Sequence, residues 1–412
     1  MGTGATTNIL LLYIPGMDLR NLSESVTPFL SQALQDYSWA EIRTQPSPEQ
    51  LSTVLTGMNP HDHGIWQMKL VRSAVANQRS RTIWERLPDL LTTTYQCARH
   101  QIFHDCDVPT LPPARRKSFE MRRLKLHGRR DTDEVLKQLG DVPSIVTHLG
   151  KQQCEYTFTD RLGDFDTAAN RVAKGNVKLE FVHMHAVDMM GHWVLDTPQK
   201  LRSVYRRADD LIEVIADKCQ RNGITMFAAT DHGQERVTAD IDLRRKISEL
   251  DLDPVEFSYY LQPITARFWF HTARARQKIM DLLTATGHGT LITFLELEQF
   301  DIKFSQPSYG EVYFLADPGY LFFPHDFHHP LVNLVFGLKD SQQRRRLVSP
   351  RHTAYHGYLP HYESEKGWIV CLNQKFQFQK KEIKLIDLMP SMLSLLGEAQ
   401  PQFMTGRNQI RF

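Results

Sequence analysis

The chain has 412 residues, of which 41% are hydrophobic and 23% are charged, and its formal net charge is +2. These values are typical of a soluble globular protein that is long enough to bury a sizeable core. The near-neutral charge excludes a bulk attraction to nucleic acid or to an anionic membrane, so we expect neither as a partner.

The cysteines and the N-terminus both bear on the compartment. The five cysteines are odd in number and show no CxxC spacing, which indicates reduced thiols and no zinc finger. The apolar run Ile9–Ile14 is too short for a membrane span and lacks the basic start of a signal peptide. We therefore expect a cytoplasmic protein.

The first elements read as strand, helix and strand. Residues Asn8–Ile14 predict a buried strand that Pro15-Gly16 breaks, and Asp18 stands just beyond it. A helix is expected over Leu22–Leu34, and Trp39–Arg43 predicts a second strand.

A capping pattern follows the second strand. Ser47 is predicted as an N-cap, Pro48 as the first helical residue and Gln50 as the partner in a capping box, with Gly57 ending the helix. A serine at a helix N-terminus faces free N–H groups and can form an anion site. The alternative is that Ser47 only caps the helix.

Two further segments between the second and third strands carry charge or histidine. His63, in the turn Asn59–Ile65, is expected to tie down its own backbone rather than to bind a ligand. Residues 105–133 form a Pro- and Arg-rich insertion, which we interpret as a solvated surface in preference to a binding site for an anionic leaving group.

The third and fourth strands each end in metal-ligand residue types. Val177–Met184 predicts a strand, followed by Asp188 and His192, which share one face if the segment is helical. The residues Leu201–Cys219 repeat apolar side chains at helical spacing, so they predict a core-facing helix. The strand Ile224–Thr230 then runs into Asp231-His232.

The segment 237–350 predicts a change of architecture. Residues 237–350 contain short strands and a helix near Ala275–Leu283, and we interpret them as an inserted α+β cap subdomain. His356 then precedes a strand over Trp368–Leu372 and a last helix over Ile386–Leu396. The expected core therefore comprises 1–236 and 351–412, an α/β fold with a mostly parallel central sheet flanked by helices.

The candidate ligands recur at or near strand ends, where ligands sit in open α/β sheets. They are three carboxylates and three histidines: Asp18, Asp188, Asp231, His192, His232 and His356. Mixed Asp/His ligation suits zinc, with manganese or iron as alternatives. Two such ions can hold a phosphate group between them, one of them activating the Ser47 oxygen.

These motifs together resemble the alkaline phosphatase superfamily, in its type I phosphodiesterase/nucleotide pyrophosphatase branch. The resemblance covers roughly Asn8–Ile65, Glu180–Gln234 and the segment from His352 to the C-terminus. It rests on Ser47-Pro48 with Thr56-Gly57 and His63-Gly64-Ile65, on Asp188-x-x-x-His192, on Asp231-His232-Gly233, on His356-Gly357-Tyr358, and on the ending from Ile386 to Arg407.

The resemblance implies an alkaline-phosphatase-like core and two metal ions. One ion would use Asp188, His192 and His356, and the other would use Asp18, Asp231, His232 and the Ser47 oxygen. Ser47 would attack phosphorus and form a covalent phosphoseryl-type intermediate. The implied function is hydrolysis of a small phosphorylated substrate, with a phosphodiester as the preferred substrate class.

Several alternatives stay open. The family usually has Asp-Gly where this chain has Pro15-Gly16, and Thr44 rivals Ser47 as the nucleophile. Phosphonate hydrolysis, phosphomonoester hydrolysis and phospho-group transfer fit the same scaffold. A catalytically inactive protein that binds a phosphorylated ligand is a further alternative. The natural substrate and the oligomeric state do not follow from the sequence.

Overall fold

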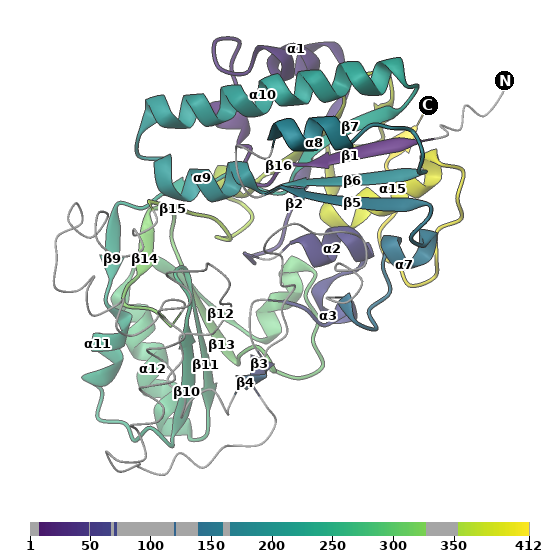
Figure 1. Ribbon diagram of the computed structural model, residues 1–412. Helices are drawn as coiled ribbons and strands as arrows, with labels where there is room; N and C mark the ends of the chain where they lie inside the picture. Colours follow the sequence, from purple (N-terminus) through teal and green to yellow (C-terminus); the bar gives the residue numbers. More distant parts are fainter. Residues whose placement is uncertain are drawn as a thin grey trace, which may run out of the picture. The chain divides into compact units, whose positions relative to one another are not determined.

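The computed structural model describes residues 8–48, 50–66, 70–71, 119–120, 139–159, 165–326 and 353–411. The chain divides into two compact units: unit 1 contains 1–65, 124–235 and 359–412, and unit 2 contains 66–123 and 236–358 (Figure 1). Most of the predicted insertion 105–133 lies outside the described residues, and the predicted domain boundaries remain predictions.

Unit 1 is built on a seven-stranded sheet with the order β18-β2-β16-β7-β1-β6-β5. Every strand in it is parallel to the others except β16, which is antiparallel to both of its neighbours. This confirms the predicted α/β fold with a mostly parallel sheet. The strands are β1 (Ile9–Tyr13), β2 (Trp39–Arg43), β5 (Cys154–Thr159), β6 (Leu179–Met184), β7 (Thr225–Thr230), β16 (Gly367–Cys371) and β18 (Glu382–Lys384).

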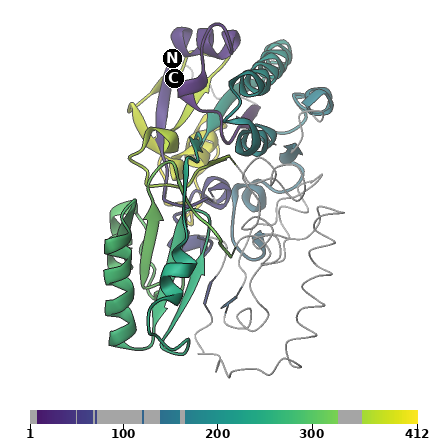
Figure 2. The ribbon, with the colours of Figure 1, turned by 90° about the vertical axis from the view of Figure 1, so that its left-hand side faces the viewer.

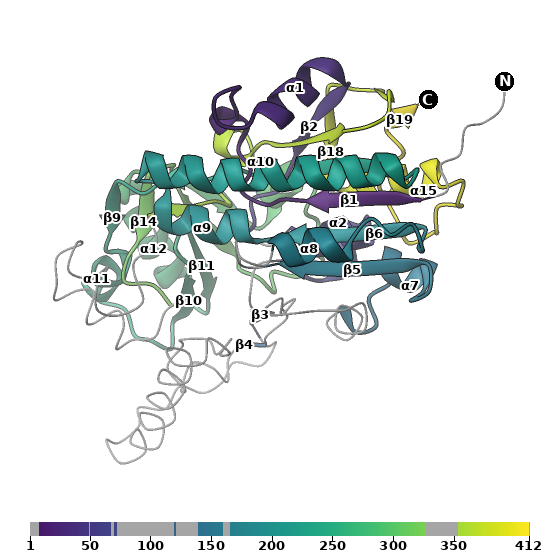
Figure 3. The same ribbon diagram turned by 45° about the horizontal axis from the view of Figure 1, so that its top comes forward.

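Helices cover both faces of this sheet because its central strands are apolar on both sides. In β1, Leu10 and Leu12 enter one core and Ile9, Leu11 and Tyr13 enter the other. The first core is covered by α1 (Pro28–Asp36), α8 (Phe165–Arg171), α9 (Ala186–Val194) and α10 (Pro198–Arg221), and the second by α2 (Leu51–Thr56), α7 (Ile145–Leu149) and α15 (Leu388–Leu395) (Figures 1 and 3).

Two predicted helix starts are wrong. Helix α1 begins at Pro28, not near Leu22, because proline fixes the first helical position there. Helix α2 begins at Leu51, and the predicted capping box at Ser47 does not form. The N-cap is Gln50, whose side-chain amide donates to the carbonyls of Gln45 and Ser47 in the turn before the helix. The predicted end of α2 at Gly57, in the left-handed conformation, is confirmed.

The parallel strands β1, β2, β6 and β7 end at one edge of the sheet, which positions the candidate site. The segments that follow them contain Asp18, Ser47, Asp188 and Asp231, respectively. Sequence-distant residues are therefore gathered by strand direction alone, as ligand sites in open α/β sheets usually are.

Unit 2 contains an antiparallel sheet with the order β10-β11-β13-β12. Its strands are β10 (Phe257–Leu261), β11 (Thr265–Phe270), β12 (Gly289–Thr293) and β13 (Val312–Ala316), and α12 (Ala273–Thr286) packs against them (Figure 2). Strands β9 (Ala239–Ile241) and β14 (Tyr320–Phe322) form a parallel pair, and α11 (Leu243–Ser248) follows β9. The mixed helix and strand content agrees with an α+β architecture.

Two general properties were also predicted from the sequence. Cys154, Cys219 and Cys371 are buried free thiols. Among the described residues, none of the helices is both long enough and apolar enough to cross a membrane.

Candidate metal centre

Asp188 is the centre of the candidate site in unit 1. It lies in the first turn of α9, and His192 lies one turn later on the same face, as the spacing predicted. The His192 Nε2 is 3.5 Å from Asp188 Oδ1, and the Nε2 of His185 is 3.3 Å from Asp188 Oδ2. Sequence reasoning missed His185, although its position three residues before Asp188 was the available signal.

Gln234 fixes the orientation of the Asp188 carboxylate. Its Nε2 donates to Asp188 Oδ1 at 2.6 Å and to the Asp188 carbonyl at 2.9 Å, and the side chain is buried. Gly191 makes this possible, because a Cβ there would lie 1.9 Å from Gln234 Oε1. Gln234 thus links the Asp188 motif to the Asp231-His232 motif, a role that sequence reasoning also missed.

Asp231 and His232 follow β7 directly and are both buried. The His232 Nε2 is 3.5 Å from Asp231 Oδ2. Burial raises the pKa of Asp231, and the adjacent His232 opposes this only in part. Burial opposes charge on His232, but Asp231, Asp188 and Glu365 together raise the pKa of His232.

The donor set fits a divalent cation. A carboxylate oxygen of Asp188 and a ring nitrogen of His232 lie within 4.8 Å of each other. Among the described residues, the buried Oδ1 atom of Asp231 has no hydrogen-bond partner, which is unusual for a buried carboxylate oxygen and would be satisfied by a cation. Carboxylate and imidazole ligands together are those that zinc accepts. Unit 1 therefore contains a candidate metal-binding group.

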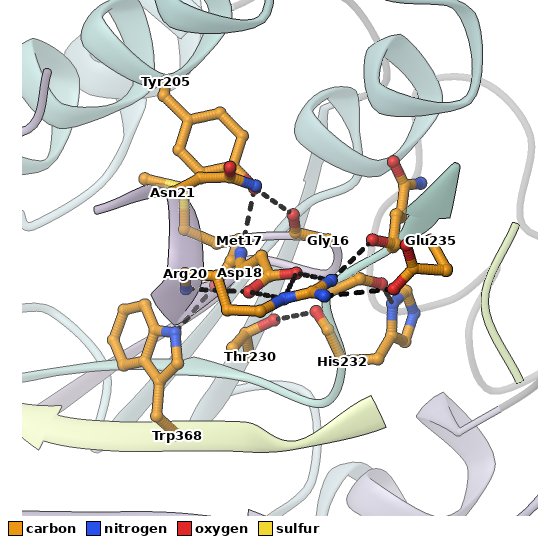
Figure 4. Close-up of polar contacts among 12 residues, drawn as sticks. Gly16, Met17, Asp18, Arg20, Asn21, Tyr205, Thr230, His232, Glu235 and Trp368 are labelled. Carbon is orange, nitrogen blue, oxygen red and sulfur yellow. Dashed lines mark hydrogen bonds and ion pairs between the residues drawn. The ribbon is translucent and has the colours of Figure 1, made fainter. Parts of the chain in front are cut away.

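Asp18 lies near this group but faces a different partner. Both of its carboxylate oxygens accept hydrogen bonds from Arg20, at 2.7 to 3.1 Å (Figure 4). The Arg20 guanidinium continues to the Gln234 carbonyl and to Glu235 Oε2. Among the described residues, Asp18 belongs to no set of three side chains whose ligand atoms lie within 4.8 Å of one another.

The loop before Asp18 is held by two side chains from distant parts of the chain, Tyr205 of α10 and Trp368 of β16. The Tyr205 hydroxyl donates to the Gly16 carbonyl at 2.8 Å and accepts from the Asp18 N–H at 2.9 Å. The Trp368 indole donates to the Met17 carbonyl at 2.7 Å (Figure 4). These bonds satisfy the buried backbone of the loop and fix where Asp18 points.

Ser47 lies in the turn after β2, and its side chain is buried. Its backbone is fixed by the Ser47 N–H, which donates to the Gln45 carbonyl at 2.7 Å. The rival nucleophile Thr44 donates its hydroxyl to the Glu365 carbonyl at 2.9 Å. Glu365 itself is a buried carboxyl group that raises the pKa of His232, and no sequence motif marks it.

His63 has the structural role that the sequence predicted. Its Nδ1 accepts the Ile65 N–H at 3.1 Å, which leaves Nε2 to donate to Thr53 Oγ1 at 3.1 Å. Burial lowers the pKa of His63 to about 3, so the ring is neutral. His356, by contrast, belongs to unit 2, two residues before its boundary, and its predicted role as a ligand stays a prediction.

Comparisons with known proteins agree with this architecture. The human ectonucleotide pyrophosphatase/phosphodiesterase 5 structure is 13% identical with a TM-score of 0.63, covering 96% of this chain and 96% of that one. A murine ectonucleotide pyrophosphatase/phosphodiesterase 5 structure is 14% identical with a TM-score of 0.56, covering 98% and 97%. An inactive murine variant in complex with AMP is 13% identical with a TM-score of 0.56, also covering 98% and 97%.

Similarity at these identities shows the fold, whereas the family is shown by sequence. No curated protein matches the chain significantly. The family model described as type I phosphodiesterase / nucleotide pyrophosphatase matches residues 9–330, which is more than half of the chain. The chain therefore belongs to the type I phosphodiesterase/nucleotide pyrophosphatase family of phosphoric ester hydrolases.

Proposed function

We propose that the chain is a metal-dependent phosphodiesterase that uses Ser47 as its nucleophile. The observation that carries the proposal is the group around Asp188 and His232, at the same edge of the sheet as the Ser47 turn, in a member of a phosphodiesterase family. The proposed substrates are small phosphorylated compounds of the cytoplasm. Neither nucleic acid nor a membrane is proposed as a partner.

The residues proposed to hold a catalytic divalent ion are Asp188, His192, His232 and His356, with zinc preferred over manganese or iron. A divalent ion bound there would supply positive charge to the phosphate oxygens and lower the pKa of an adjacent hydroxyl. The chain prepares Asp188 for this role through Gln234 and His185, which fix its two oxygens.

Ser47 then performs a two-step displacement. Its oxygen forms a bond to phosphorus and loses its proton, while the bond from phosphorus to the leaving alcohol breaks and that alcohol gains a proton. Water subsequently attacks the same phosphorus, the bond to Ser47 breaks, and the serine regains its proton. The products are an alcohol and a phosphomonoester.

Ser47 is preferred over Thr44 because Thr44 would have to give up a buried hydrogen bond to act as the nucleophile. The Thr44 hydroxyl is engaged with the backbone of Glu365, so its attack would break a buried hydrogen bond at a cost of about 1–3 kcal/mol.

The test is turnover of bis(para-nitrophenyl) phosphate by the full chain with added zinc or manganese. We expect activity in the native chain, a loss on the order of 10³-fold or more in Ser47→Ala, and retained activity in the matched variant Thr44→Val. Absence of turnover from a metal-loaded chain would contradict the proposal. Equal activity of Ser47→Ala and the native chain would remove Ser47 from the mechanism.

The same assay separates the alternatives. Para-nitrophenyl phosphate tests a phosphomonoesterase, an aryl phosphonate tests a phosphonate hydrolase, and an added alcohol acceptor tests a transferase. A chain that binds these compounds without converting any of them would be an inactive phospho-ligand-binding protein.

A further inference from the structure

We infer that this chain holds one divalent ion at the strand ends rather than two, because β1 supplies no ligand there. The sequence predicted a second ion at Asp18, Asp231, His232 and Ser47. The inference rests on the proposed function, since it concerns the number of ions at the same site. Two independent features carry it, namely the position of Pro15 and the contacts of Asp18.

The residues that follow β1 run beside the residues that follow β7. Tyr13 pairs with Ala229 in the parallel strands β1 and β7, and beyond this pair the residues Pro15-Gly16 run alongside Asp231-His232. The Gly16 N–H donates to the His232 carbonyl at 3.0 Å, which keeps the two segments side by side beyond the strands. A proline side chain offers no ligand atom, so the segment that follows β1 contributes no metal ligand beside Asp231 and His232.

Gly16 places the same turn against the centre of the site. Its φ is +80°, and a Cβ there would lie 2.8 Å from the Asp188 Cα. The backbone at Pro15-Gly16 therefore touches the start of α9. A carboxylate on residue 15 would enter the candidate group, whereas Asp18 is three residues further along the loop.

Asp18 is committed to Arg20. The guanidinium binds both carboxylate oxygens, and the Arg20 N–H donates to Asp18 Oδ1 at 2.8 Å as well (Figure 4). Gly233 closes the other side, because a Cβ there would lie 2.1 Å from Asp18 Oδ2. The side chain of Asp18 is 3% exposed, so it has little freedom to turn toward Asp231 and His232 without losing these bonds.

Arg20 also balances the charge of Asp18, so this carboxylate does not need a cation to compensate it. Glu365 is the competing ligand to test, because it also acts on His232.

The experiment is elemental analysis of the full chain after equilibration with zinc and removal of the excess. We expect about one zinc ion per chain in the native protein and in Asp18→Asn, and a loss of that ion in Asp188→Asn. Asp209→Asn is the matched control, because Asp209 is a buried carboxylate that binds the Phe29 and Leu30 N–H groups in α1. It should retain one ion.

Pro15→Asp is the decisive gain of function: it should raise the zinc content from about one ion to two. If this variant does not fold, as judged by circular dichroism, Asp18→Asn still decides the question. Two ions in the native chain, falling to one in Asp18→Asn or in Glu365→Gln, would overturn the inference, as would a chain that binds no zinc.

The metal content tests this inference, and the turnover assay tests the proposed function independently. One ion per chain without phosphodiester turnover would sustain this inference and contradict the proposed function. Two ions per chain with turnover would contradict this inference and support the proposed function.

Discussion

Substitution of Gly191 by alanine tests the arrangement that orients Asp188. The new Cβ would lie 1.9 Å from Gln234 Oε1 and 2.8 Å from its Cδ, and Gln234 is 3% exposed. The methyl group must therefore displace the amide from α9. Both hydrogen bonds from Gln234 to Asp188 are then lost.

The magnitude follows from two opposing terms. Loss of one hydrogen bond to a carbonyl and one to a carboxylate costs about 2.5–4 kcal/mol. Alanine in place of glycine inside a helix contributes about 1 kcal/mol in the opposite direction. The free energy of unfolding should therefore fall by roughly 1.5–3 kcal/mol, despite the better helix propensity. The zinc affinity should fall on the order of 10- to 100-fold, because Asp188 loses a partner that orients it.

The assay is urea unfolding of the metal-free chain, together with a competition titration for zinc. The double variant Gly191→Ala/Gln234→Ala is the control. Once the amide is removed there is room for the methyl group, so Gly191→Ala should then be neutral or slightly stabilising. Additive effects of the two substitutions, or a Gly191→Ala chain as stable as the native one, would refute the reasoning.

Three further predictions concern buried polar groups. Tyr205→Phe should lower the free energy of unfolding by about 1–3 kcal/mol, because the Gly16 carbonyl loses its buried donor; an unchanged urea midpoint would contradict this. His63 binds its proton more weakly in the folded chain (pKa about 3) than in the unfolded one, so stability should fall as the pH drops from about 6.5 toward 3. At pH 5.5 this loss amounts to about 1.4 kcal/mol, and urea unfolding of His63→Gln should show correspondingly less pH dependence. Burial raises the pKa of Glu180 to about 7, so the folded chain binds the proton more strongly and stability should fall as the pH rises from about 4.5 through 7. Glu180→Gln should abolish that fall, and thermal melts at pH 5 and pH 8 would check it.

The elements that gather the site could be predicted from short local patterns. The strands Trp39–Arg43 and Ile224–Thr230 are apolar or alternating runs bounded by turn residues, and the structure has them within a residue of the predicted ends. The Asp188 and His192 pair followed from helical spacing alone. Such features depend on neighbours in the sequence, which a single sequence displays.

The features that the sequence did not predict depend on contacts between distant segments. The turn at Ser47 resembles a capping box, but the Gln50 amide turns back to the carbonyls before it. Asp18 reads as a strand-end ligand, yet the Tyr205 and Trp368 side chains fix its loop and Arg20 takes its carboxylate. The contacts made by Gln50 and by Arg20 can be recognised only when the fold is known.

Gln234 illustrates the same limit from the other side. Its partner Asp188 is 46 residues away, and the signal for their contact was a glycine inside the helix between Asp188 and His192. A glycine inside a helix lowers helix stability, so Gly191 indicated that another group packs closely against the helix at this position. The sequence did not show which group this is. The structure names it as the Gln234 amide.

The central claim is that Ser47 forms a covalent bond to phosphorus, and mass spectrometry of the acid-quenched enzyme tests it most directly. During turnover of bis(para-nitrophenyl) phosphate, the peptide that contains Ser47 should gain one arylphosphoryl group, and Ser47→Ala should lack it. An adduct on Thr44, or steady turnover with no adduct at any quench time, would contradict the claim.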